Sequence, residues 1–115
     1  MPGPEYDALD AAARAALRAP SIFNTQPWQW RHRDGALELW ADWTRQLAVV
    51  DRGGQLLLLS CGAALHHARI SLAAAGWIAS VERTGERDRL ARIRLVGRDA
   101  PDPAAAVHAF LRHYA

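Results

Sequence analysis

One short loop, Pro20-Ser21-Ile22-Phe23-Asn24-Thr25-Gln26-Pro27, concentrates side chains that could recognise a ligand. It places the hydroxyl of Ser21 and the carboxamides of Asn24 and Gln26 between prolines that restrict the backbone. Carboxamides both donate and accept hydrogen bonds, so the set suits a planar heterocycle whose edge alternates carbonyl oxygens and ring nitrogens. The same residues could instead form a self-capping turn, in which Ser21 and Asn24 bond their own backbone. The residue types favour neither interpretation over the other.

Other reactive side chains are predicted to be structural. Cys61 is expected to be a buried small hydrophobe, because His66 lies too far round a helix to activate its thiol. His66 and His67 are neighbours that would point in different directions, which predicts no metal site. Trp28 and Trp30 share one strand face and are expected in the core. The sequence contains no Gly-x-Gly-x-x-Gly motif, no P-loop and no evident carboxylate pair, so it assigns no catalytic residue.

The charge pattern argues against a nucleic-acid partner. The chain has 115 residues and a formal net charge of +2, and all of its basic residues except histidine are arginine. The densest basic stretch, Arg83 to Arg98, also carries Glu86 and Asp88. A phosphate-binding surface needs an excess of positive charge on one face. Charges of both signs along this stretch predict a solvent-exposed hairpin instead.

The elements that must position the loop follow from periodicity and turn residues. We expect a helix over Pro4–Arg18, a hairpin over Trp28–Trp40 that turns at Asp34-Gly35, a loop over Thr44–Gly54, a helix over Gln55–Ala75, strands over Trp77–Thr84 and Leu90–Val96, a linker over Gly97–Pro103 and a helix over Ala104–Ala115. This order predicts a single α+β domain over residues 1–115. The longest strictly apolar run has four residues, so no membrane span is expected. With one cysteine and no secretory signal, a cytoplasmic location is expected.

The helix predicted over Gln55–Ala75 is apolar on nearly every side. One stripe contains Leu56, Leu59, Ala63, His66 and Ile70. A second contains Leu57, Leu58, Ala64, Leu65, Ala68 and Leu72. Only Arg69 is charged. Such a helix is buried on several sides, and in a chain this short part of that burial is expected from a partner subunit.

Three segments resemble one known family. The string Ala19-Pro20-Ser21-Ile22-Phe23-Asn24-Thr25-Gln26-Pro27-Trp28 resembles the signature of the nitroreductase-like FMN flavoproteins. The segment from Cys61 to Trp77 resembles the long central helix of that family, which packs across the dimer interface. A third similarity covers Leu37–Asp42 and Arg45-Gln46-Leu47. Taken together, these segments most resemble the N-terminal part of the Acg-type branch, whose members carry two nitroreductase-like halves in one polypeptide. The similarity runs from Leu9 to Val96.

The resemblance implies a partial nitroreductase-like fold, with a long buried central helix against a small antiparallel sheet. It implies an FMN cofactor with Pro20, Ser21, Asn24 and Gln26 beside the isoalloxazine ring. The activity implied is electron transfer from NAD(P)H to a nitroaromatic, quinone or similar acceptor.

The chain also departs from the family pattern. The family's upstream arginine-serine-arginine segment and its downstream half have no counterpart here, so we expect a truncated domain. A homodimer, or a separate second half, would then complete the site. The alternative is a non-catalytic module for flavin binding or dimerisation.

Overall fold

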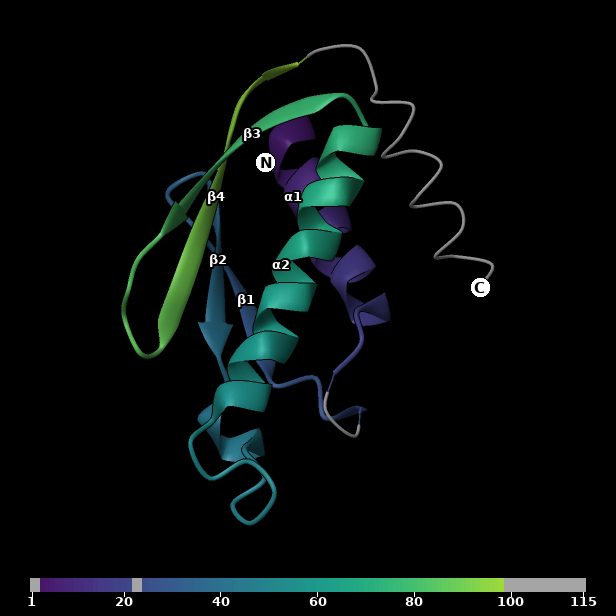
Figure 1. The fold of residues 1–115 in the computed structure, drawn as a ribbon. Coiled ribbons are helices and arrows are strands. Elements are labelled where there is room, and N and C mark those ends of the chain that lie inside the picture. Colours follow the sequence, from purple (N-terminus) through teal and green to yellow (C-terminus); the bar gives the residue numbers. More distant parts are fainter. Residues whose placement is uncertain (1–2, 22–23, 99–115) are drawn as a thin grey trace.

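A computed structural model describes residues 3–21 and 24–98 of the chain (Figure 1). In chain order the elements are helix α1 (Pro4–Ala15), 3₁₀ turn η1 (Ala16–Arg18), strands β1 (Trp28–Arg33) and β2 (Ala36–Ala41), 3₁₀ turn η3 (Trp43–Arg45), helix α2 (Gln55–Ala74), and strands β3 (Trp77–Arg83) and β4 (Arg89–Arg98). The described residues therefore form an α+β fold, as the sequence predicts. The helix expected over residues 104–115 lies outside them.

Strand pairing produces one antiparallel sheet in the order β1-β2-β4-β3. The β1–β2 hairpin turns at Asp34 and Gly35, whose φ angles of 52° and 74° are those of a two-residue turn with both central residues left-handed. β4 continues to Arg98, which pairs with Trp77 of β3. The linker predicted to begin at Gly97 is therefore wrong at residues 97 and 98, because strand pairing extends through them.

Both helices pack on the same face of the sheet, which makes two layers (Figure 1). Alternation along the strands sends Leu37 and Leu39 of β2 and Ala91 and Ile93 of β4 into this interior. The helices contribute the apolar residues Leu9, Ala12 and Ala16 of α1 and η1 and Leu57, Cys61, Ala64, Leu65, Ala68 and Leu72 of α2. Trp28 completes the core, as predicted, and Trp30 packs against it.

α2 crosses the sheet with one stripe buried and the other exposed (Figure 1). The stripe with Leu57, Ala64 and Leu72 faces the core, whereas Leu56 and Leu59 are 39% and 71% exposed. Leu58, predicted to share the buried stripe, is instead 41% exposed. By length and composition alone α2 is long and apolar enough to cross a membrane, and 44% of its most apolar window is buried within the fold.

Candidate functional site

A groove of about 610 Å³ forms where the Pro20-Ser21 turn meets the exposed stripe of α2. Its lining residues are Pro20, Ser21, Leu56, Leu59, Ser60, Gly62, Ala63 and His66. The walls are almost wholly apolar, and Ser60 directs its hydroxyl to the backbone of Leu56, with 3.0 Å from Oγ to the carbonyl oxygen. The groove joins the two sequence motifs that carried the family resemblance.

The turn beside the groove is held partly by its own hydrogen bonds. The Ser21 hydroxyl oxygen accepts a bond from the Gln26 backbone N–H at 3.1 Å, and the Asn24 N–H donates to the Ser21 carbonyl at 3.1 Å. The Gln26 carboxamide donates to the carbonyl of Leu17 at 3.1 Å. Ser21 thus caps its own turn, as one of the two sequence interpretations expected, while the side chain of Asn24 is exposed to solvent.

The backbone of this turn is strained. Asn24 and Gln26 have φ angles of 57° and 47°, in a region that side-chain-bearing residues adopt at a cost. The Thr25 hydroxyl between them is buried and has no hydrogen-bond partner among the described residues. Strained residues and unsatisfied buried polar groups concentrate at functional sites.

The four residues expected to contact the cofactor do not all reach the groove. Pro20 and Ser21 line it. Asn24 and Gln26 belong to the same turn but are not among the lining residues. An apolar groove bordered by the hydroxyls of Ser21 and Ser60, with two carboxamides in the adjoining turn, fits the flat ring of a flavin. The part of the chain that the structure describes offers a flavin phosphate no arginine in the groove lining.

Cys61 lies beneath the turn and is chemically quiet. It is fully buried, and its thiol donates to the carbonyl oxygen of Pro27 at 3.3 Å. Burial, helped by the nearby Asp42 carboxylate, raises the pKa of the Cys61 thiol to about 12. The thiol therefore stays protonated at neutral pH, and the prediction that Cys61 is buried is confirmed.

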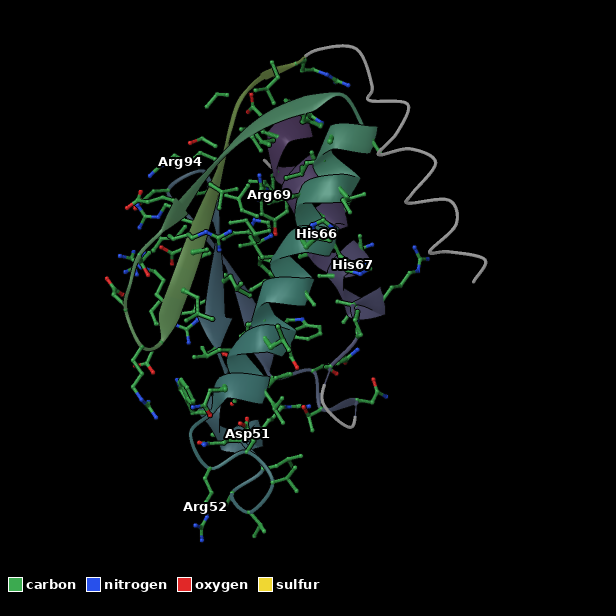
Figure 2. The ribbon with its side chains drawn as sticks, in the orientation of Figure 1. Asp51, Arg52, His66, His67, Arg69 and Arg94 are labelled. Carbon is green, nitrogen blue, oxygen red and sulfur yellow. The ribbon has the colours of Figure 1, made fainter. Side chains whose placement is uncertain are left out.

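His66 and His67 diverge as predicted. His66 is exposed at the groove, whereas His67 is buried, and their rings meet edge to face with centroids 6.3 Å apart (Figure 2). Within residues 3–21 and 24–98, no group of three histidine, cysteine or acidic side chains could hold a metal ion.

A buried carboxylate on the far face of the sheet escaped sequence reasoning. Glu38 of β2 is fully buried and accepts hydrogen bonds from Arg89 at 3.0 Å, Arg92 at 2.8 Å and Trp40 at 3.3 Å. Strict alternation with Leu37 and Leu39 places Glu38 opposite the core, which is the signal that could have identified it. The pairing also neutralises part of the basic strand β4.

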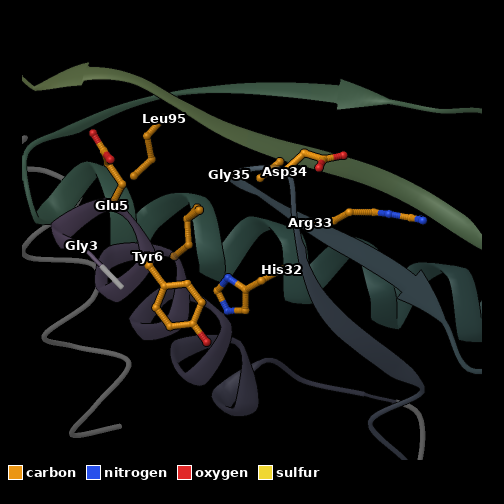
Figure 3. Close-up of a pocket in the computed structure, with 10 residues that line it drawn as sticks. Gly3, Glu5, Tyr6, His32, Arg33, Asp34, Gly35 and Leu95 are labelled. Atoms are coloured by element: carbon orange, nitrogen blue, oxygen red, sulfur yellow. The ribbon is translucent and has the colours of Figure 1, made fainter. Parts of the chain in front are cut away.

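A second cavity, of about 530 Å³, opens between the start of α1 and the β1–β2 turn (Figure 3). There the rings of Tyr6 and His32 stack with centroids 4.2 Å apart, and His32 Nε2 lies 3.7 Å from an Asp10 carboxylate oxygen. These contacts fasten α1 to β1. No expectation from the sequence concerned this pocket.

Comparison with known proteins supports the family resemblance, although no family model matches the chain. "Putative NAD(P)H nitroreductase Rv3131" of Mycobacterium tuberculosis is 46% identical over 80 residues, which are 70% of this chain and 23% of that protein. "Putative NAD(P)H nitroreductase acg" of the same organism is 46% identical over 77 residues, 67% of this chain and 23% of that protein. "Uncharacterized protein Rv3127" is 36% identical over 92 residues, 74% of this chain and 27% of that protein.

The chain thus spans about a quarter of the length of these curated relatives. Over that span it is a relative of the nitroreductase-like proteins that include Acg.

Proposed function

We propose that this chain forms part of an FMN-dependent oxidoreductase of the nitroreductase type. It would serve electron transfer from NAD(P)H to a nitroaromatic, quinone or similar acceptor. The observation that carries the proposal is the groove, in which the Pro20-Ser21 turn faces the exposed stripe of α2. The relatives named as nitroreductases support the reaction class. We further propose that residues 1–115 form one truncated domain with a partial nitroreductase-like fold.

The described residues would hold and orient the ring rather than act as acid or base. Leu56, Leu59 and Ala63 offer apolar surface against which a flat ring can pack. Ser21 and Asn24 offer polar groups for the ring's edge, and Gln26 retains its carboxamide oxygen as an acceptor. Bound FMN would supply the two-electron chemistry, because the cofactor carries the reactive centre in flavoproteins.

The site requires a second polypeptide segment in this proposal. Charge-assisted bonds to arginine are strong contributors to phosphate binding, and among residues 3–21 and 24–98 no arginine lines the groove. The curated relatives are about four times as long as the matched region. We propose that a second copy of the chain, or a separate nitroreductase-like half, covers the exposed stripe of α2 and provides the missing contacts.

One observation favours a non-catalytic flavin-binding or dimerisation module as the second candidate. The side chains of Ser21 and Gln26 already make hydrogen bonds of 3.1 Å each, to the Gln26 N–H within the turn and to the Leu17 carbonyl of η1. Fewer polar groups then remain for a ligand. In that case the groove would serve assembly, with or without a ring bound in it.

The decisive experiment is a fluorescence titration of the purified protein with FMN, run beside sedimentation analysis. We expect saturable quenching in a dimeric species, followed by FMN-dependent oxidation of NADPH with a quinone acceptor. Quenching without turnover would favour the module, and free FMN at every protein concentration would contradict a flavin site that copies of this chain complete by themselves.

Asn24→Gly tests the contribution of the turn without adding strain. Glycine accepts the left-handed φ of position 24 while removing the carboxamide. Loss of one ring contact should weaken FMN binding about 2- to 10-fold, since a hydrogen bond contributes ~0.5–1.5 kcal/mol. Asp34→Gly is the matched control, because Asp34 has a similar φ of 52° in the distant β1–β2 turn. Equal affinity for FMN in both variants would exclude Asn24 from the ring site.

A further inference from the structure

Arg45 reaches from the loop after β2 to the turn that borders the groove. Its Nη1 donates a hydrogen bond to the Thr25 carbonyl at 2.9 Å, across a separation of twenty residues. Its Nε lies 3.4 Å from a carboxylate oxygen of Asp42. One planar guanidinium therefore connects the end of the β1–β2 hairpin to the turn, and its fixed geometry suits two simultaneous contacts.

The bonded carbonyl lies at the strained point of the turn. Thr25 stands between Asn24 and Gln26, the two residues with φ angles of 57° and 47°. Such conformations persist only where the surroundings hold them. The internal bond from the Gln26 N–H to Ser21 Oγ holds one side, and Arg45 holds the carbonyl between the two strained residues.

Asp42 is itself firmly anchored. Its carboxylate accepts hydrogen bonds from the Thr44 hydroxyl and from the Thr44 N–H, the latter at 3.2 Å, and from the Gln29 carboxamide at 3.4 Å. Its own N–H donates to the Pro27 carbonyl at 2.9 Å, at the far end of the same turn. The bonds from Thr44 outweigh burial and lower the pKa of Asp42, so the carboxylate remains charged at neutral pH.

We propose that Arg45, oriented by Asp42, is a positioning residue that keeps the turn carrying Ser21, Asn24 and Gln26 in its ligand-ready conformation. This proposal rests on the proposed function, because the turn is one wall of the proposed site for the flavin ring. The contact joins two parts of the same chain, so it can be tested on the free protein. Preorganisation of this kind strengthens binding by removing the cost of ordering the turn.

The test is amide hydrogen exchange of the ligand-free protein, measured by NMR for wild type, Arg45→Met and Arg45→Lys. The Arg45 side chain is 57% exposed, so global stability should scarcely change. In Arg45→Met we expect the Asn24 and Gln26 amides to exchange roughly 3- to 10-fold faster, as for loss of one solvent-exposed hydrogen bond, with the Leu39 and Ile93 amides unchanged. Arg45→Lys should restore part of the protection, because its ammonium can reach only one of the two partners at a time.

Arg52→Met is the matched control, since Arg52 lies in the following loop and points away from the body of the protein (Figure 2). Unchanged exchange at Asn24 and Gln26 in Arg45→Met would overturn the proposal. So would faster exchange throughout the sheet, which would make Arg45 a general stabilising residue.

An FMN titration of the same variants separates this proposal from the proposed function. If wild type binds FMN, Arg45→Met should bind it more weakly. The fold-loss of affinity should be about equal to the fold-increase in the exchange rate of the turn amides, while Arg52→Met should match wild type. Full FMN affinity in Arg45→Met would overturn the positioning role. If wild type binds no FMN, the flavin site fails, and the exchange result still decides whether Arg45 orders the turn.

Discussion

Glu38 and Cys61 are both fully buried, yet their surroundings push their protonation in opposite directions. Burial favours the neutral form of an acid, and at Cys61 this effect dominates and raises the pKa of the thiol to about 12. At Glu38 burial also acts to raise the pKa, but hydrogen bonds from Arg92, Arg89 and Trp40 together outweigh it and hold the pKa below 4.5. The result is a thiol that stays protonated at neutral pH under the candidate site and a carboxylate that stays charged at neutral pH within the basic sheet face.

Glu38→Gln should destabilise the fold by about 1–3 kcal/mol at pH 7, because it leaves two arginines without their shared charge. The loss of unfolding free energy is moderate, because the side chains of Arg89 and Arg92 stay 23% and 22% exposed to water. The lowered pKa of Glu38 means that its stabilisation is present above pH 4.5 and is lost as pH falls through the folded-state pKa. Urea unfolding at pH 7 and at lower pH should therefore show the gap between wild type and variant closing on acidification.

Glu86→Gln provides the control for this measurement. Glu86 pairs with the same Arg89 at 3.0 Å, but its side chain is 53% exposed. An exposed pair contributes roughly 0–1 kcal/mol, so this variant should stay near wild type. Equal losses in the two variants would mean that burial of Glu38 has no special energetic weight.

The sequence predicts those helices and strands whose formation depends on residues close together in the chain. The helix over α2 and the hairpin of β1 and β2 follow from their periodicities and from the Asp34-Gly35 turn. The pairing of β2 with β4 depends on partners far apart in the chain, as does the bond from Arg92 to Glu38 across 54 positions. The candidate turn could be located by its motif, but its strain and its bond to Arg45 arise only from tertiary contact.

The start of α2 depends on a cap supplied from outside the helix. Asp51 is buried, and its carboxylate oxygens accept the N–H groups of Leu56 and Leu57 at 3.0 and 2.9 Å. These donors have no partner inside the helix, and the negative charge also favours the positive end of the helix dipole. Asp51→Asn should therefore cost about 1–2 kcal/mol of unfolding free energy, measured by denaturation monitored through circular dichroism.

Its neighbour supplies a comparison at the same loop. Arg52→Ala changes an exposed side chain and should alter stability by less than about 0.5 kcal/mol. A loss in Asp51→Asn no larger than that in Arg52→Ala would show that the carboxylate does not cap α2. Because α2 forms one wall of the groove, a real loss of the cap should also loosen the Leu56 and Leu59 side of the candidate site.

For the whole molecule, the distribution of apolar surface is uneven. The helices and sheet enclose one core, while Leu56 and Leu59 of α2 remain exposed along the groove. Leu58 of α2 is also exposed, but it lines a different hollow beside Trp43 and Leu90. Small domains gain limited stability from a single core, and exposed apolar surface of this kind marks interaction sites. The relatives contain far more chain than the matched region, which could supply a cover there. These facts favour assembly over an isolated monomer.

Leu59→Glu tests this assembly at the most exposed of the three leucines. Leu59 is 71% exposed, so a charge there should leave the stability of the folded monomer within about 0.5 kcal/mol of wild type. Burying that charge in an apolar interface is costly, so the variant should sediment as a monomer at concentrations where wild type self-associates. Val49→Glu, at an 86% exposed position in the loop before α2, controls for added surface charge and should assemble as wild type does.

Self-association of Leu59→Glu equal to that of wild type would place the interface elsewhere. A wild type that remains monomeric throughout would exclude the homodimer, leaving a separate second half as the only proposed cover for α2.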